Sequence, residues 1–246
     1  MTLEMATATH PGHVRVSNED HVFADPARGL VIVADGMGGE TGGEIASAAA
    51  CAAIDAATRD RPGLVDALVA AASAVTAGGA TIAAVQIVNA TAEIAHVGDV
   101  RVYILRRAPS ALASSAPAYC PPVVLASGAM MVCATRDHSS ICELVEHGHI
   151  DRMAAASHPL RSRVNRALGR SDPRADVTVV PLVDGDRILA CTDGLWSAVS
   201  DPAIANLLAR EVTARAMVDA LIDSALSAGG PDNIGVAVVV YSSRDT

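Results

Sequence analysis

Residues 29–47 read GLVIVADGMGGETGGEIAS, and the interpretation of the whole chain starts from this stretch. The apolar run 29–34 is short and begins at a glycine, which is typical of a buried strand, and we expect this strand to end at Asp35. Residues 43–59 are rich in Ala and poor in Gly, so they predict a helix that lies close against a sheet. The turn between them contains glycines that would let the backbone approach a ligand closely: Gly36, Gly38 and Gly39.

Further strands and helices are expected on both sides of this unit. The expected elements are an extended segment at 13–23, strands at 80–88, 91–97, 100–106 and 234–241, helices at 63–76 (with Pro62 at its start), 139–147, 150–156, 201–210 and 213–228, and a hairpin within 175–191 that turns at Asp184-Gly185. Residues 107–130 are dominated by Ala, Ser and Pro, which indicates a surface loop. Strands and helices segregated in this way predict an α+β fold, in which helices cover antiparallel sheets.

Composition excludes several classes of protein. The chain has 246 residues, with 18 Arg, no Lys and 27 acidic residues, so its formal net charge is −9. A hydrophobic fraction of 51% excludes a disordered chain. A nucleic-acid-binding protein needs a cationic face and aromatic stacking platforms, whereas this chain is acidic and has only five aromatic residues. The location of the acidic excess is therefore the question that the sequence poses.

The cysteines and the N-terminus bear on the cellular location. The five cysteines are an odd number without a CxxC pair, which indicates a reduced protein. The first residues, MTLEMATATHPGH, lack the basic start and the apolar core of a signal peptide. No uninterrupted apolar run reaches the length of about 18–20 residues that a membrane helix needs. These observations predict a cytoplasmic protein.

Four aspartates share one local context. Asp35, Asp99, Asp193 and Asp232 each lie at a strand end or turn, beside a glycine or after a Gly-Pro pair. A single Asp-Gly pair is more often just a turn, but several strand ends on one edge of a sheet can converge. Carboxylates that converge repel one another and raise each other's pKa unless cations lie among them. Because the pattern offers oxygen ligands without a His/Cys cluster, it favours Mg²⁺ or Mn²⁺.

Seven motifs in order carry a resemblance to a known family. They are RVSNED, VADGMGGETGGEIAS, AHVGDVRVYILR, TRDHS, HPLRSRVNRALG, DRILACTDGLW and GGPDNIGVAVV. Over residues 12–241 the chain resembles the metal-dependent Ser/Thr protein phosphatases of type 2C (the PPM family), and their bacterial stand-alone members most. The resemblance implies a central antiparallel β-sandwich flanked by layers of helices, as one catalytic domain over residues 1–246. The rival interpretation of DGMGG, a nucleotide-binding phosphate loop, is disfavoured because such loops carry Lys and no acid at the strand end.

The resemblance also implies a metal site. Asp35 would bridge two cations, Mn²⁺ or Mg²⁺, and the Gly36 carbonyl would bind one of them. Asp193 and Asp232 would hold the first cation, and Glu19 would support the second through water. Two divalent cations would invert the local negative field, which otherwise repels a phosphate dianion. They would also lower the pKa of a bridging water, and the resulting hydroxide would attack phosphorus directly.

Three further residues complete the implied site. Arg15 would bind the substrate phosphate, because its planar fork of N–H donors can grip two oxygens. A surface salt bridge from Arg15 to Glu19, four residues on, is the alternative. Asp20 would order water near the cations. Asp99, together with Asp193, matches a third and weaker metal position in the family.

The activity implied by the resemblance is hydrolysis of phosphoserine and phosphothreonine in proteins, in opposition to bacterial Ser/Thr kinases. The implied partners are phosphorylated protein substrates, and among them a Ser/Thr kinase, without nucleic acid or membrane, and the protein is expected to be a monomer. One alternative is a non-catalytic regulatory module that binds a phosphoprotein, although such relatives usually lose a metal-binding aspartate. Another is a phosphatase dedicated to an antagonist of an anti-sigma factor, which differs in target and not in chemistry.

Three features depart from the family pattern. Met37 stands where eukaryotic relatives often have a His that serves as the proton donor, and Met cannot donate a proton. Residues 107–130 exceed the usual short hairpin and predict a tolerated insertion, with a partner or substrate contact as the alternative. Residues 137–160 resemble the family's flap, which contributes to substrate choice. His147 and His149 within it are expected to be solvated polar residues rather than a metal site.

Overall fold

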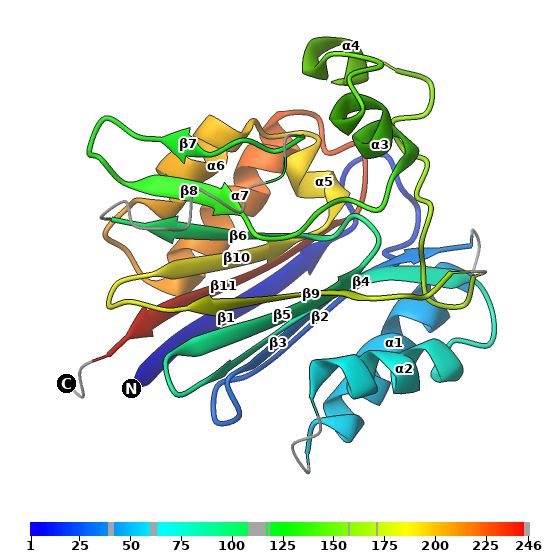
Figure 1. Cartoon of the computed structure of the whole chain (residues 1–246), viewed down its shortest axis with the longest axis horizontal. Coiled ribbons are helices and arrows are strands. Elements are labelled where there is room, and N and C mark those ends of the chain that lie inside the picture. Colours follow the sequence, from blue (N-terminus) through cyan, green and yellow to red (C-terminus); the bar gives the residue numbers. More distant parts are fainter. Residues whose placement is uncertain are drawn as a thin grey trace.

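Two antiparallel β-sheets pack face to face, and helices cover both outer faces (Figure 1). The computed structural model describes residues 1–38, 42–59, 63–107, 117, 119–156, 158–170 and 172–243. The arrangement confirms the expected α+β fold with a central antiparallel sandwich flanked by helices. Gly39 in the predicted turn and Pro62 at the predicted helix start lie outside the described residues.

The first sheet contains five strands in the order β2-β3-β4-β5-β9. They are β2 (Asp20–Asp25), β3 (Leu30–Met37), β4 (Gly79–Val88), β5 (Thr91–Val97) and β9 (Asp176–Pro181). Side chains of β3 alternate between two environments, as a pleated strand requires. Leu30 and Ile32 pack against Ile54 of α1 (Gly42–Ala57) and Leu68 of α2 (Leu64–Ala74), whereas Val33 faces the other sheet. Both helices therefore cover the outer face of this sheet.

The second sheet contains six strands in the order β1-β11-β10-β6-β8-β7. They are β1 (Thr2–His10), β11 (Ile234–Ser242), β10 (Arg187–Cys191), β6 (Arg101–Arg106), β8 (Met130–Cys133) and β7 (Val123–Val124). Leu189 and Val238 pack against Met217 and Leu221, and Ile188 faces the interior of the sandwich. The helices of the outer face are α5 (Asp193–Trp196), α6 (Asp201–Leu208) and α7 (Ala214–Ser227) (Figure 1).

Two short helices stand beside the sandwich rather than on a face of it (Figure 1). They are α3 (Ser140–Glu146) and α4 (Arg152–Ala156), within the segment that the sequence predicts as a flap. The Ser139 hydroxyl caps α3 by accepting the Cys142 N–H at 3.2 Å. The Ser140 N–H donates to the Arg163 carbonyl at 3.1 Å and closes the base of this segment.

Several expectations about strands are wrong. Of the segment 13–23, only the residues from Asp20 on are in a strand, and the residues before it form turns and bends. The hairpin at Asp184-Gly185 does not form, because β9 and β10 belong to different sheets and the turn connects the two layers. Gly185 has a φ of +84°, so the turn signal is real although the strands beside it do not pair. Strand β1 was not expected at all.

The predicted insertion 107–130 is only partly a surface loop. Residues 108–116 and 118 lie outside the described part of the chain. Among the others, Val124 is exposed, but Cys120 and Met130 are buried, and β7 pairs with β8 at the edge of the sheet. The end of this segment is therefore part of the sheet and its core.

All five cysteines are buried and free. Among the helices that the structure describes, none combines the length and the apolar character needed to cross a bilayer.

Candidate active site

Two aspartates face each other across neighbouring strands. Asp20 begins β2 and pairs in register with Asp35, near the end of β3. Thr192, directly after β10 of the other sheet, donates its hydroxyl to Asp20 Oδ2 at 2.7 Å. The same hydroxyl accepts the Gly235 N–H at 2.8 Å. Asp20 is therefore buried and fixed at a point where the two sheets contact each other.

Asn233 holds the segment that precedes β2. Its Oδ1 accepts the Glu19 N–H at 2.8 Å, and its Nδ2 donates to the carbonyls of Pro11 at 2.9 Å and Ser17 at 2.8 Å. Because Asn233 follows Asp232 directly, one turn positions an acidic side chain and the segment opposite it. In the sequence, Asn233 is distinguished only by its place in the GGPDN motif, and that motif is the signal that could have identified it.

The carboxylate of Glu19 lies against the first turn of α1. Its Oε2 occupies the place that a Cβ atom at Gly43 would take, and the Gly36 peptide contacts the same turn. The Gly36 N–H and the Ser47 hydroxyl both donate to the Glu19 carbonyl, at 3.1 and 2.6 Å. A helix N-terminus carries partial positive charge, which favours a carboxylate there. Glycine is required at both positions because the backbones approach so closely.

Asp99 and Asp193 are connected through a tryptophan. Asp193 is the first residue of α5, and Trp196, the last, donates its indole N–H to the Asp99 carbonyl at 3.0 Å. The Arg101 guanidinium lies 3.7 Å from the centroid of the Trp196 ring and forms a buried ion pair with Asp137 at 2.7 Å. Arg101 therefore supplies a fixed positive charge beside this pair of aspartates, and it lowers the pKa values that burial raises.

Arg15 forms an ion pair with Asp232, at 2.7 Å, and not with Glu19. Its side chain is 57% exposed, so the guanidinium lies at the solvent edge of the group. The hydrogen bond to Asp232 raises the pKa of Arg15, and the charges of Asp193 and Asp35 act in the same direction. The alternative pair with Glu19 is therefore not the one that forms.

The aspartates lie close enough for their charges to act on one another's pKa values. Burial raises the pKa of Asp35 well above its ordinary range, and Asp20 is the next cause. Burial raises the pKa of Asp193 to about 6, followed by the charge of Asp232, and it raises the pKa of Asp99 to about 8. The structure thus brings together all the acidic residues predicted from the sequence: Glu19, Asp20, Asp35, Asp99, Asp193 and Asp232.

This donor set fits hard divalent cations. It consists of carboxylates, with the Gly36 peptide beside them, and has no sulfur or imidazole member among the residues named above. Burial is the largest cause of the raised pKa values of Asp35, Asp99 and Asp193, and the charges of neighbouring aspartates raise these pKa values further. Oxygen ligands with surplus negative charge are what Mg²⁺ and Mn²⁺ prefer.

Comparison with known proteins identifies the family. The chain is 31% identical to the Ser/Thr phosphatase stp of Listeria innocua, over 94% of this chain and 93% of that protein. It belongs to the type 2C (PPM) family of bacterial Ser/Thr protein phosphatases. It is also 33% identical to the Ser/Thr protein phosphatase PstP of Mycobacterium tuberculosis, over 97% of this chain. The chain spans 45% of the length of PstP. No family model matches the chain.

Solved structures of PPM phosphatases have the same fold. A crystal structure of the M. tuberculosis phosphatase PstP/Ppp has a TM-score of 0.81 and 32% identity, covering 98% of this chain and 100% of that one. A structure of the PstP catalytic domain in complex with two manganese ions has a TM-score of 0.80 and 29% identity, covering 98% of this chain and 99% of that one. The PPM phosphatase MsPP of Mycobacterium smegmatis, in complex with cacodylate, has a TM-score of 0.78 and 31% identity, with coverage of 98% and 99%.

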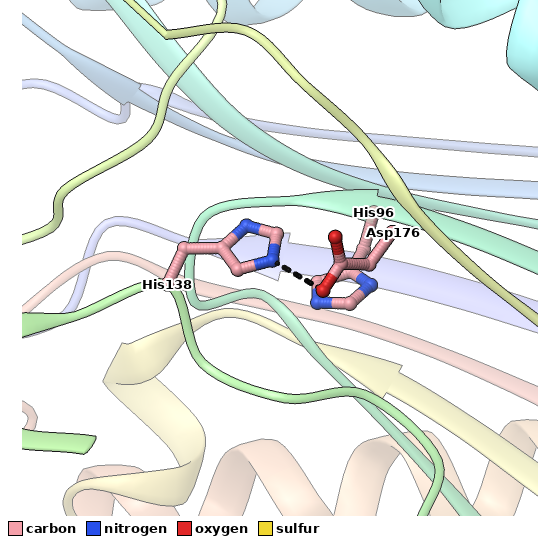
Figure 2. A group of neighbouring side chains, drawn as sticks. All are labelled: His96, His138 and Asp176. Carbon is pink, nitrogen blue, oxygen red and sulfur yellow. Dashed lines mark ion pairs between the residues drawn. The ribbon is translucent and has the colours of Figure 1, made fainter. Parts of the chain in front are cut away.

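In addition to the carboxylates, this PPM chain has a second cluster of potential metal ligands, which the sequence did not predict (Figure 2). His96, His138 and Asp176 place one potential ligand atom each within 4.8 Å of one another. They come from the end of β5, the segment before α3 and the start of β9. Because they are about 40 residues apart in sequence, no local spacing joins them. Two of the quoted motifs contain members of the cluster, His96 in AHVGDVRVYILR and His138 in TRDHS, but neither motif shows that the two residues meet.

His147 and His149 stack on each other with ring centroids 6.1 Å apart. His147 Nδ1 lies 2.7 Å from the Glu143 carbonyl, and that contact is exposed. Among the residues that the structure describes, the only group of three or more potential ligands that meets the metal-site distances is the His96 cluster, and neither histidine belongs to it.

Proposed function

We propose that the chain is a metal-dependent protein phosphatase that hydrolyses phosphoserine and phosphothreonine in proteins, as one catalytic domain over residues 1–246. The observation that carries the proposal is that the charges of four further carboxylates act on the buried pair Asp20 and Asp35, while the exposed guanidinium of Arg15 pairs with one of the four. The four are Glu19, Asp99, Asp193 and Asp232. A relative of the same fold whose structure contains two manganese ions supports the choice of divalent cations.

The carboxylates supply the ligands for these cations. Asp35, Asp193 and Asp232 would hold two ions, with the Gly36 carbonyl as a further ligand and Glu19 acting through water. When bound, two divalent ions offset the charge of the phosphate and acidify water at neutral pH. Mn²⁺ and Mg²⁺ both suit these donors. Asp99, with Asp193, would provide a third and weaker position.

Arg15 would bind the phosphate group. Its ion pair with Asp232 is partly exposed, and such pairs contribute only about 0–1 kcal/mol, so the guanidinium can change partners at little cost. When cations occupy Asp232, the fork of N–H donors becomes available for two phosphate oxygens. The exposure of Arg15 places that fork where a protein substrate can reach it.

Asp20 and Met37 bear on how water and the leaving-group proton would be handled in the reaction. Asp20 is held by the Thr192 hydroxyl, and its other oxygen is available to order water. Met37 ends β3 directly after the Asp35-Gly36 pair and has no proton to donate. The departing serine or threonine oxygen would therefore take its proton from solvent or from another group.

The natural substrates would be phosphorylated proteins, in opposition to Ser/Thr kinases. The family, the exposed Arg15 and the flap-like segment at 137–160 support a protein substrate. A monomer in the cytoplasm, expected from the sequence, stays a prediction, as does a substrate contact at 107–130.

The deciding experiment is an assay of phosphoserine, phosphothreonine and phosphotyrosine peptides with Mn²⁺, Mg²⁺ or EDTA. We expect turnover of the first two peptides with metal and its loss in EDTA. Asp193→Asn should abolish turnover, and Asp223→Asn, at an exposed site on α7, is the matched control. Turnover that is unchanged in EDTA and in Asp193→Asn would refute the mechanism. Metal binding and phosphopeptide binding without turnover would instead favour the regulatory module.

A further inference from the structure

The side chain of His138 is held between the Asp176 carboxylate (Figure 2) and the Gly98 backbone amide. Its Nε2 lies 3.1 Å from Asp176 Oδ2, and its Nδ1 accepts the Gly98 N–H at 3.0 Å. The imidazole is 1% exposed, and the His96 ring stacks on it with centroids 4.6 Å apart. An Arg166 Nη1 lies 2.9 Å from Asp176 Oδ1 and keeps that carboxylate charged.

These contacts fix the tautomer of His138. A backbone N–H can only donate, so Nδ1 must offer a lone pair and the proton of the neutral ring must lie on Nε2. The Nε2–H then donates to Asp176. Burial lowers the pKa of His138 to about 4, which agrees with a neutral ring. Asp176, His138 and Gly98 therefore form one directional chain of hydrogen bonds.

The same contacts argue against a metal ion in this cluster. A histidine that binds metal through one nitrogen normally donates a proton from the other, whereas His138 Nδ1 accepts one. The guanidinium of Arg166 also lies beside both candidate ligands, 2.9 Å from Asp176 and 3.2 Å from His138 Nε2. His96 Nδ1 is buried and has no hydrogen-bond partner, but one free ligand atom does not make a metal site.

The chain of hydrogen bonds ends on the turn that carries Asp99. Gly98 has a φ of +101°, and Thr81 packs where its Cβ would be, so this turn is tightly constrained. His138 contacts the Gly98 residue twice, because its backbone N–H also donates to the Gly98 carbonyl at 2.9 Å. The Trp196 indole donates to the Asp99 carbonyl on the other side. The Gly98-Asp99 turn is therefore held by His138 on one side and by Trp196 on the other.

We propose that His138 is a positioning residue, which orients the Asp99 carboxylate toward Asp193 through the Gly98 amide, with Asp176 and Arg166 fixing the orientation of its ring. The inference rests on the proposed function, in which Asp99 and Asp193 form the weaker cation position. A residue that orients a metal ligand in this way typically changes metal affinity or activity about 10–100-fold when it is replaced.

Two variants distinguish the contributions of the two ring nitrogens of His138. In His138→Asn the side-chain oxygen takes the place of Nδ1 and can accept the Gly98 N–H, but it cannot reach Asp176. In His138→Gln the amide replaces Nε2 and leaves the Gly98 N–H without its acceptor. We expect His138→Asn to keep nearly the wild-type dependence of turnover on Mn²⁺ concentration, and His138→Gln to need about tenfold more Mn²⁺ or above. If the role were merely structural, both variants would shift the melting temperature without this difference in metal dependence.

Binding of Mn²⁺, measured directly by electron paramagnetic resonance, keeps the proposal separate from the proposed function. If the wild type binds Mn²⁺ but turns over no phosphopeptide, the proposed activity fails, and the binding curves of the two variants still test His138. Asp99→Asn should weaken the last Mn²⁺ to bind, and adding His138→Gln to it should cause little further loss. Equal Mn²⁺ binding by the wild type and His138→Gln would overturn the proposal.

His96→Gln is the matched control for a metal site in the cluster itself. It keeps a donor for the Arg136 carbonyl, which lies 2.8 Å from His96 Nε2, and removes the unpartnered Nδ1. We expect unchanged Mn²⁺ binding in this variant. A loss as large as that of His138→Gln would show that the cluster binds the ion directly and would overturn the positioning role.

Discussion

Replacing Asp193 should stabilise the metal-free protein while it abolishes the proposed activity. The pKa of Asp193 is raised from 3.8 to about 6, first by burial and then by the charge of Asp232. A pKa difference of one corresponds to about 1.4 kcal/mol, so ionised Asp193 destabilises the metal-free fold by about 3 kcal/mol. Asn has the same shape and no charge, and therefore removes this cost.

The sign of the effect depends on pH. Asp193 binds its proton more tightly in the folded state, so its contribution to stability is fully present below pH 3.8 and is lost as the pH rises through about 6. In EDTA at pH 8 the free energy of unfolding of the Asp193→Asn variant should exceed that of the wild type by up to about 3 kcal/mol. This difference corresponds to about 6–12 °C in melting temperature. At pH 4 the two should unfold at nearly the same temperature.

Thermal unfolding of the two proteins with EDTA or millimolar Mn²⁺ tests this reasoning, with Asp223→Asn as the control for loss of one exposed charge. At pH 8, Mn²⁺ should raise the melting temperature of the wild type and have a smaller effect on Asp193→Asn, because a ligand that binds only the folded state stabilises it. A wild-type melting temperature indifferent to Mn²⁺, or an Asp193→Asn variant less stable than the wild type in EDTA at pH 8, would refute the clustering of charge.

Three further predictions concern single contacts. Arg15→Lys should raise KM for phosphopeptides about tenfold with a smaller change in kcat, because Lys lacks the bidentate fork; steady-state kinetics would show otherwise if both constants stayed at wild-type values. Thr192→Val should lower the free energy of unfolding by about 1–3 kcal/mol in urea titrations, since Asp20 and a backbone N–H each lose their partner. Arg106→Met should cost about 3–5 kcal/mol, because Asp186 is left charged and fully buried, and adding Asp186→Asn should recover part of that loss; no recovery would contradict this account.

Local patterns predicted the strands that pair with their sequence neighbours. Strand β5 matches the predicted residues 91–97, and β4 begins one residue before the predicted 80. The turn between these two strands contains Asn89 with a φ of 48°, and the turn after β5 contains Gly98 with a φ of 101°. Strand β1 could not be predicted in this way, because it pairs with β11 from the other end of the chain, with Thr2 opposite Ser242. The turn between β9 and β10 likewise does not show which strands they pair with, because their partners lie in different sheets.

The acids of the candidate site could be predicted because each lies in a local motif. The residues that hold those acids were missed, although each stands beside a motif acid: Thr192 before Asp193, Asn233 after Asp232, and His138 after Asp137. Their partners are backbone or carboxyl groups of segments distant in sequence, so only the folded chain shows what they bind.

The chemical nature of these holding residues fits a site meant for cations. Thr192, Asn233 and His138, whose pKa burial lowers, are neutral side chains that fix positions by hydrogen bonds without cancelling negative charge. The cationic neighbours cancel this charge only in part. Arg101 lowers the pKa values of Asp99 and Asp193 but forms a buried ion pair with Asp137, and Arg15 is exposed and can change partners. A buried, unpaired Lys or Arg at any of these places would stabilise the metal-free fold but compete with the metal. The fold therefore keeps its carboxylates buried and close to one another, and bound cations would relieve both the cost of burying these charges and their mutual repulsion.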